Sequence, residues 1–579
     1  MDCRIEKSLG RFLKAFGLLV PGVWLISGCH LQRAPGLAYG TDPYSTNETR
    51  TIDGIDLEAI SETPPLPIQE AVEQNRFDSI ENATMEIRRP ITLAEVRSAA
   101  LSNNLDLRVE RMSPEIARET YNAEAAKFDQ LLAASIDRSE VDSPTGLKTS
   151  SVLSSVGLFK PMPSGGEMGV EFFSQRYNTN DPFVSPDPAY DNDLKFSISQ
   201  PLLRGAGFQT NTHSIRVAKL QSGIEAARAK LEAIRILAAA DKAYWAVYGA
   251  SMEIEIRRQQ YELAIRQLHD AKRYVASTKG ATVEITRAES GLPGRLEGII
   301  NAVTNFRIRE RNLKRIMNRP SLDWNSRESI LPLTEPNPVG LSFDGRSLAD
   351  FAVENRMEML ALEIQLAIDE SQIEFDQNVR LPLFTMDYEY NVNGLGRHYG
   401  DANYQIGDGD YADWSIGFQA EVPIGFRASN ARLRQSILTR VQRLATQDQR
   451  RQAIEQEVYD ALDLLDQNWQ RILAARQEVV LAARTYEAER KLFQMGAEGR
   501  TSTDVLDAAA RLALAQLREI SALVDYQIAQ VDIAFATGTL LGYSEVDWRS
   551  EDSPRDSMLV GSATSRVNIT DTISFAKIS

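Results

Sequence analysis

The stretch from residue 209 to 278 constrains the fold more than any other part of the chain. It contains no proline, and its apolar residues recur at steps of three and four, as along the seam of a coiled coil. At about 1.5 Å per residue, a helix of some seventy residues is on the order of 100 Å long. Because no globular domain buries such a helix, the sequence predicts an elongated protein. The seam positions are Ile224, Ala227, Leu231, Ile234 and Ala238.

This long helix is expected to end in a helical hairpin. Residues 282–317 predict a helix that returns along the first one, with a break at Gly291, Pro293 and Gly294. The first tip therefore lies near residues 279–288.

A second seam runs through the second half and leads to a second tip, near residues 493–508. There Gly496 and Gly499 are suited to end one helix, and Ser502 or Thr503 to cap the next. Asn468 falls on this seam, where it either fixes the register of the helices or faces a solvated duct. The seam consists of Ile454, Val458, Ala461, Leu465, Ile472, Ala475, Val479 and Ala482.

The two halves of the chain repeat the same order of features, as an internal duplication would. Asn104 and its neighbours match the stretch around Arg356, and Glu284 matches Asp504. This predicts a first repeat at 90–340 and a second at 341–545. The offset between matching features drops by about 30 residues, which we assign to an extra hairpin near 144–176 around Gly165 and Gly166.

Segments with period two lie between the helices and predict strands with one apolar face. The clearest are 384–392, 414–422 and 194–198, the last followed by Gln200-Pro201-Leu202. After residue 29 there is no apolar run of about 18 residues, so any membrane span must be made of strands. We expect four amphipathic strands per chain, too few to close a barrel around an aqueous lumen, so several chains must contribute. The predicted fold class is mainly α with a membrane β-barrel segment.

The N-terminus has the form of a targeting segment. Basic residues precede an apolar run at 15–26, and Leu25-Ile26-Ser27-Gly28-Cys29 resembles the bacterial lipobox. We predict a signal peptide at 1–28, lipidation of Cys29 and a flexible tether at 29–89. The alternative is a plain signal peptide with an incidental cysteine. Residues 546–579 are expected to be a disordered tail.

Composition argues against other functions. A net charge of −16 disfavours nucleic acid as a partner, and neither the four His nor the two Cys form a ligand-like cluster. No nucleophile elbow, phosphate-binding loop or zinc-protease motif occurs, so we expect no enzyme, no cofactor and no metal site. The loop at Asp408-Gly409-Asp410 is either a cation site or, as we favour, a solvated surface loop.

The second tip carries a motif that resembles a known family. Arg500 is followed after three residues by Asp504-Val505-Leu506-Asp507-Ala508. Together with the Gln-Pro-Leu strand end and the duplication, this resembles the TolC-like outer-membrane efflux proteins over residues 90–545. The resemblance implies three chains that form one twelve-stranded outer-membrane barrel, with helices enclosing an export duct across the periplasm.

The resemblance also implies a function and partners. The protein would be the passive outer-membrane component of a tripartite efflux pump or type I secretion system. Its partners would be two further copies of itself, a periplasmic adaptor protein, an inner-membrane RND or ABC transporter, and outer-membrane lipid. The competing hypothesis is a periplasmic structural or adaptor coiled coil without a pore of its own.

The resemblance places a gate at the periplasmic tip. Asp504 and Asp507 match acidic positions that ring the constriction in the family, and Arg500 matches a basic position that ties helices together in the closed state. Glu284 is the acidic partner expected for Arg500, and the alternative role of all four is helix capping. The tip residues Gly280, Gly496, Gly499, Val505 and Leu506 are expected to contact the adaptor.

Overall fold

The computed structural model describes residue 68 and residues 87–277, 282–322, 328–495, 497 and 499–546. The chain divides into two units, Met1–Arg76 and Phe77–Ser579, and the fold below is that of the second unit. The predicted signal peptide, Cys29, the tail from residue 547, Gly280 and Gly496 lie outside the described residues, as does the predicted tether apart from residues 68 and 87–89.

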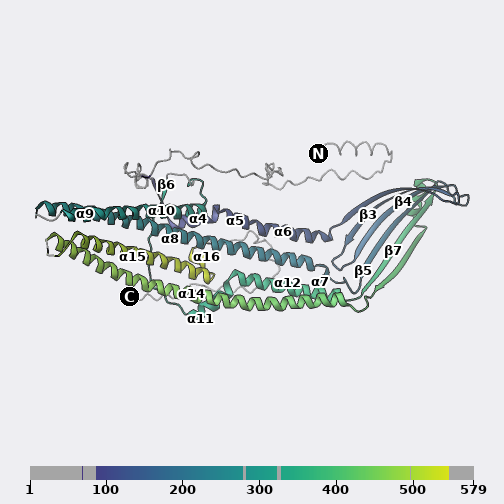
Figure 1. Cartoon of the computed structure of the whole chain (residues 1–579). Coiled ribbons are helices and arrows are strands. Elements are labelled where there is room, and N and C mark those ends of the chain that lie inside the picture. Colours follow the sequence, from purple (N-terminus) through teal and green to yellow (C-terminus); the bar gives the residue numbers. More distant parts are fainter. Residues whose placement is uncertain are drawn as a thin grey trace. The chain divides into compact units, whose positions relative to one another are not determined.

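Long helices dominate this unit, as predicted (Figure 1). In the first half, α8 (His213–Ser277) runs for 65 residues, and in the second, α14 (Arg427–Gln494) runs for 68. The remaining helices of the first half are α4 (Leu93–Asn103), α5 (Leu105–Glu110), α6 (Met112–Ala125), η1 (Ala126–Phe128), α7 (Phe208–Asn211), α9 (Val283–Ser290) and α10 (Leu292–Met317). Those of the second half are α11 (Gly345–Asn355), α12 (Met357–Val379), α13 (Tyr399–Asp408), α15 (Ser502–Ala536) and α16 (Leu540–Tyr543).

The breaks between helices follow from local chemistry. Thr92 and Glu95 form a capping box at the start of α4, and Asn104 ends α4 and caps α5 through the N–H of Leu107. The predicted break in the returning helix is confirmed at Gly291, where α9 gives way to α10.

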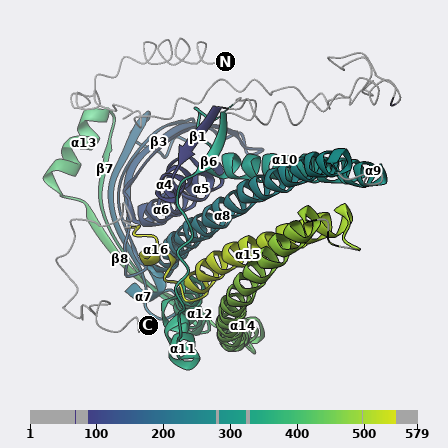
Figure 2. The same cartoon turned by 90° about the vertical axis from the view of Figure 1, so that its left-hand side faces the viewer.

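Four helical segments lie side by side along the whole length of the helical region (Figure 2). Near the strands their order is α6, α8, α12 and α14, and towards the tips it is α10, α8, α15 and α14. The predicted seam of α14 is buried from Ile454 to Ala475, largely against α15. A further core around Tyr244, Trp245 and Leu313 joins α8 to α4 and α10.

A six-stranded antiparallel sheet lies at the other end of these helices (Figure 1). The prediction of four strands is wrong, because the extra hairpin is inserted in line with the others and pairs on both sides within the sheet. The spatial order is β2, β3, β4, β5, β7 and β8. Their bounds are β2 (Leu131–Asp142), β3 (Lys148–Pro161), β4 (Glu167–Thr179), β5 (Ala189–Pro201), β7 (Leu383–Gly396) and β8 (Ala412–Glu421).

The register of the sheet separates an apolar face from a polar one. Directly paired residues share a face, and the faces alternate along each strand. Two consecutive rows on one face are apolar on all six strands. The first row is Leu132, Leu158, Val170, Phe196, Tyr390 and Trp414, and the second is Ala134, Val156, Phe172, Leu194, Val392 and Ala412. The opposite face carries polar groups that pair across strands, such as Lys195 with Glu389 and Ser199 with Asp387.

The stretch from residue 391 to 413, which contains the expected loop at Asp408-Gly409-Asp410, is in large part structured. Strand β7 continues to Gly396, and helix α13 follows with a capping box between His398 and Asp401. The helix packs closely on β7 because two glycines leave room for it: a Cβ on Gly394 would lie 2.1 Å from the carbonyl oxygen of Ala402. Periodicity did not reveal this helix, since its stability depends on contact with the sheet.

A second, parallel sheet of two strands was not predicted. It joins β1 (Ile87–Ile91) to β6 (Glu328–Pro332), near the two ends of the stretch 90–340 that the sequence predicts as a first repeat. Ile91 and Ile330 anchor it in the core beside α4 and α10. Within the described residues, no helix combines the length and the apolar character needed to cross a membrane.

Candidate functional site

The tip of the second hairpin is held by a capping box. Thr501, rather than the predicted Ser502 or Thr503, is the N-cap of α15, because Asp504 then stands at the third helical position. The Asp504 carboxylate accepts the Thr501 N–H at 2.8 Å and the Thr501 hydroxyl at 3.0 Å. These bonds, with the backbone N–H first, hold the pKa of Asp504 below its ordinary value. Asp504 thus caps its own helix.

Glu284 connects the two hairpins of the chain. Its carboxylate accepts the backbone N–H of Ser502 at 2.9 Å, across 218 residues of sequence, and also pairs with Arg287 on its own helix. Burial acts to raise the pKa of Glu284, but the Ser502 N–H and Arg287 outweigh it and hold the pKa below the ordinary value. A charged carboxylate at the N-terminus of α15 also interacts favourably with the helix dipole.

Arg500 does not pair with Glu284. Instead it bonds both carboxylate oxygens of Glu489 on α14, each at 3.0 Å, within its own hairpin. Glu284 is already occupied by Ser502 and Arg287, so the predicted link between Arg500 and Glu284 is absent from this structure.

Arg295 forms a second connection between the hairpins. Its guanidinium donates to the carbonyl of Gly291 at 2.6 Å and to that of Leu506 at 3.2 Å. Burial lowers the pKa of Arg295, while the nearby Asp507 acts in the opposite sense. A Cβ on Gly291 would lie 2.9 Å from this guanidinium, so the break at Gly291 leaves room for the arginine.

A third connection between the two hairpins joins α8 to the end of α14. Asp270 on α8 is buried and accepts the side-chain amide of Gln494 at 3.2 Å, with Arg273 and Arg490 also close. Beside Asp270, the rings of Tyr274 and Phe493 pack against each other, with their centroids 5.5 Å apart. We name the residues of these three connections the inter-hairpin cluster: Asp270, Tyr274, Glu284, Arg295, Phe493, Gln494, Ser502 and Leu506.

The other predicted site residues are distributed as follows. Asp507 is exposed, whereas Val505 and Leu506 are buried within the chain. Gly499 has a left-handed backbone with φ of 80°, which suits glycine in the turn before α15. Asn468 is buried and accepts from Arg471 at 2.8 Å, and its amide donates to the Asp525 carbonyl on α15, so it faces the partner helix.

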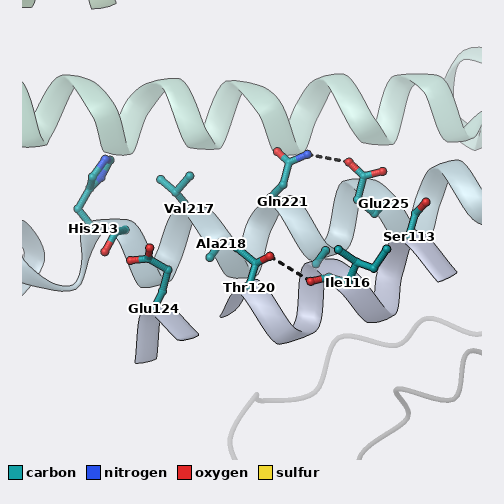
Figure 3. A pocket seen from close by; sticks show the side chains of 11 residues that line it. Ser113, Ile116, Thr120, Glu124, His213, Val217, Ala218, Gln221 and Glu225 are labelled. Carbon is teal, nitrogen blue, oxygen red and sulfur yellow. Dashed lines mark hydrogen bonds between the residues drawn. The ribbon is translucent and has the colours of Figure 1, made fainter. Parts of the chain in front are cut away.

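A hollow of about 610 Å³ lies between α6 and α8, away from the tips (Figure 3). Its polar side chains bond within the chain: Gln221 donates to Glu225, and the Thr120 hydroxyl donates to the carbonyl of Ile116. Burial lowers the pKa of His213 at one end, and its ring bonds Ser371 and Gln372. Among the described residues, no group of three or more His, Cys, Asp or Glu side chains is placed to hold a metal ion.

Comparison with known proteins agrees with this architecture. The family model of outer membrane efflux proteins matches residues 348–539. The outer membrane protein TolC of Vibrio cholerae serotype O1 is 23% identical over 300 residues, which cover 52% of this chain and 66% of that relative, just under two thirds of its length. The chain is therefore similar to the outer membrane efflux proteins, in sequence over these stretches. The resemblance found in the sequence is thereby confirmed, and the members of this family are outer-membrane channel proteins, not enzymes.

Several solved structures of membrane proteins share the fold at low sequence identity. The channel-forming protein CusC superposes with a TM-score of 0.58 at 14% identity, covering 77% of this chain and 92% of its own. A membrane protein from Pseudomonas aeruginosa gives 0.59 at 18% identity, with 77% and 93% covered. The open state of the MtrE outer membrane channel of Neisseria gonorrhoeae gives 0.55 at 17%, with 77% and 89% covered.

Of the eight residues of the inter-hairpin cluster, sequence reasoning named only Glu284, Ser502 and Leu506. Asp270 and Gln494 belong to no recognisable motif. They form a contact only because the fold brings them together across 224 residues of sequence. Arg295 had one usable signal, since it follows the Gly291-Leu-Pro-Gly break by one residue. An arginine beside a break that exposes carbonyls is a candidate donor to them.

Proposed function

We propose that this protein is a passive export channel of the outer membrane. Three copies form a barrel from their strands and a hollow cylinder from their helices, and the duct opens at the periplasmic tips. Cargo crosses without covalent chemistry, as part of a tripartite efflux pump or a type I secretion system.

The observation that carries this proposal is the two-faced sheet with two open edges. Its apolar face suits lipid, and its polar face suits an aqueous lumen. Among the described strands, β2 and β8 each pair with one neighbour, and both are exposed along their whole length on both faces. Unpaired backbone groups are costly in a bilayer, so the edges must pair with another copy of the chain.

The helices also support assembly of several copies into a closed ring. An exposed apolar stripe runs along α5 and α6 on one flank, and another lies on α14 at the opposite flank. Because the two flanks differ, one copy contacts the next head to tail, which produces a closed ring. The stripes are Leu105, Val109, Met112 and Ile116 on the first flank, and Ile437, Leu438, Val441 and Leu444 on the second.

The inter-hairpin cluster supports a gate at the tips. It ties the two hairpins of one chain together through Glu284, Arg295 and Asp270, and separating the hairpins would break these contacts. The exposed Asp507 is free to face the duct, where three copies would form a ring of carboxylates that attracts cations.

Anchoring and partners complete the proposal. The mature chain begins at a triacylated Cys29, which mass spectrometry of the purified protein should detect; an unmodified N-terminus elsewhere would contradict it. The tips dock on a periplasmic adaptor protein through Gly280, Gly496, Gly499, Val505 and Leu506. The adaptor in turn joins the channel to an inner-membrane RND or ABC transporter.

Planar-bilayer recording tests the channel directly. The purified full-length protein should produce discrete conductance steps, whereas an adaptor or structural coiled coil would produce none. The copy number is tested by light scattering in detergent, where a monomer that still conducts would contradict the ring. Ile116→Asp should weaken the trimer, and Glu119→Ala is the matched control, since it changes an exposed residue on the same helix outside the stripe.

A further inference from the structure

The inserted hairpin of β3 and β4 is the main departure from the fold expected from the sequence. It enters between β2 and β5, so that these two strands do not touch each other. A hairpin in this place has three possible positions in a channel: inside the lumen, above the membrane, or within the membrane wall. The pairing of the strands distinguishes them.

The register shows that the hairpin shares both faces of the sheet. Leu158 and Val170 stand directly between Leu132 on β2 and Phe196 on β5. In the next row, Val156 and Phe172 stand between Ala134 and Leu194. The apolar rows therefore pass through the hairpin without interruption, at the same height as on the other four strands.

The apolar side chains of the hairpin are exposed in the single chain, which indicates their surroundings in the membrane. Val156, Leu158 and Val170 are each about half exposed in the single chain, which lies between the 39% of Tyr390 and the 66% of Trp414 in the first row. Folding within the chain does not bury this face. An exposed apolar band continuous over six strands is suited to the acyl chains of a bilayer.

On the opposite face of the hairpin, an aromatic ring packs directly against the backbone of the strands. The ring of Phe159 lies over Gly169 on the neighbouring strand and over Gly157 on its own. A Cβ on either glycine would come within 3 Å of this ring. The pairing of an aromatic ring with a cross-strand glycine stabilises a curved sheet and fixes its register.

We propose that β3 and β4 are lipid-facing strands of the membrane wall, so that each chain contributes six strands and three chains close an eighteen-stranded barrel. This rests on the channel proposed above. It replaces the twelve strands expected from the resemblance and gives the barrel a wider bore.

The width of the sheet matches the width of the helical region if each chain contributes six strands. Strands about 4.8 Å apart and tilted by about 40° each occupy roughly 6 Å of circumference, so six occupy about 38 Å and four about 25 Å. Four helices side by side at about 8–10 Å occupy roughly 32–40 Å. Six strands therefore continue the wall of the four helices without narrowing. Three chains then give a barrel about 36 Å across, against about 24 Å for twelve strands.

Lipid-quenching of single labels tests the position of the hairpin. Val170→Cys and Glu171→Cys place a fluorophore on the two faces of β4, and Tyr390→Cys and Asn391→Cys do so on β7. The native cysteines are only Cys3 and Cys29, in the predicted leader and lipid anchor. In vesicles with spin-labelled lipid, positions 170 and 390 should be quenched several-fold more than positions 171 and 391.

The outcomes separate this inference from the channel. Quenching at 390 without quenching at 170 would overturn the inference and leave the channel intact. No quenching at either position would overturn both, since β7 would then also lie outside the bilayer.

Removal of the hairpin gives a second measurement that needs no label. Deleting residues 148–179 joins β2 to β5 at the end of the sheet far from the helices, which leaves an antiparallel pair. In electron-microscope projections down the channel axis, the wild-type barrel should be about 1.5-fold wider than that of the deletion variant. Equal widths would overturn the inference. If the variant does not fold, the wild-type width alone distinguishes about 36 Å from about 24 Å.

Discussion

The sheet and the helical tips differ in how far one chain satisfies its own groups. In the part of the chain that the structure describes, the outer edges of β2 and β8 are unpaired, and an apolar face of the sheet stays exposed. At the tips, the charged groups of the inter-hairpin cluster find partners within the chain: Glu284 binds Ser502, and Arg295 binds Leu506.

This difference indicates where stability and switching reside. In the channel proposed above, the sheet depends on lipid and on neighbouring copies, so changes there should affect assembly. The tips depend on a few polar contacts, each contributing about 1–3 kcal/mol, which is small enough to be reversed by a partner. The following predictions test this division, from the largest expected effect to the smallest.

The largest effect is expected on the apolar face of the sheet. Phe196→Arg places a charge in the middle of the lipid-facing band and should destabilise the inserted protein by about 2–4 kcal/mol. Ser197→Arg, one residue along on the polar face, is the matched control and should change stability much less. Urea unfolding of the protein in vesicles measures both, and equal losses would show that the two faces are not distinct.

The next effect is expected at Glu284. Glu284→Gln removes a charged acceptor from the Ser502 N–H, a bond of about 1.5–3 kcal/mol, so the open population should rise about tenfold or more. Bilayer conductance of the isolated channel measures it. Glu289→Gln is the control on the same helix, because Glu289 is exposed and pairs with Lys272 only at 3.7 Å. A Glu284 variant that conducts like wild type would place the constriction elsewhere.

Acid should open the channel through the same residue. The pKa of Glu284 is lower in the folded state than its ordinary value of 4.5, so its contribution to closure is complete above that value. The contribution is lost as the pH falls through the lowered pKa. Conductance should therefore rise in the acid range below about pH 4.5, and Glu284→Gln should remove most of this rise. An unchanged acid response in the variant would assign it to other carboxylates.

A smaller effect is expected for the acidic pair of the second tip. Asp504→Asn combined with Asp507→Asn should weaken cation selectivity and the block by multivalent cations. Since Asp504 caps α15 while Asp507 is exposed, Asp507→Asn alone should account for most of the change. Reversal potentials in a salt gradient measure it, and an equal share from Asp504→Asn alone would show that both side chains face the duct.

The smallest effect is expected at Arg500. Its partner Glu489 lies in the same hairpin, and the pair is partly exposed, so it contributes about 0–1 kcal/mol. Arg500→Ser should raise conductance, but less than Glu284→Gln. A larger rise for Arg500→Ser would indicate that Arg500 binds a neighbouring chain in the closed state.

The sequence alone determined the long helices, the break at Gly291 and the alternation of the strands, because these follow from local periodicity and from proline and glycine chemistry. It also identified the tip motif from Arg500 to Ala508. Only the tertiary structure decided that the inserted hairpin joins the sheet, that α13 forms on Gly394, and that Glu284 binds Ser502 instead of Arg500. Each of these is a choice among partners far apart in the chain, and composition and spacing carry no information about which partner lies within reach.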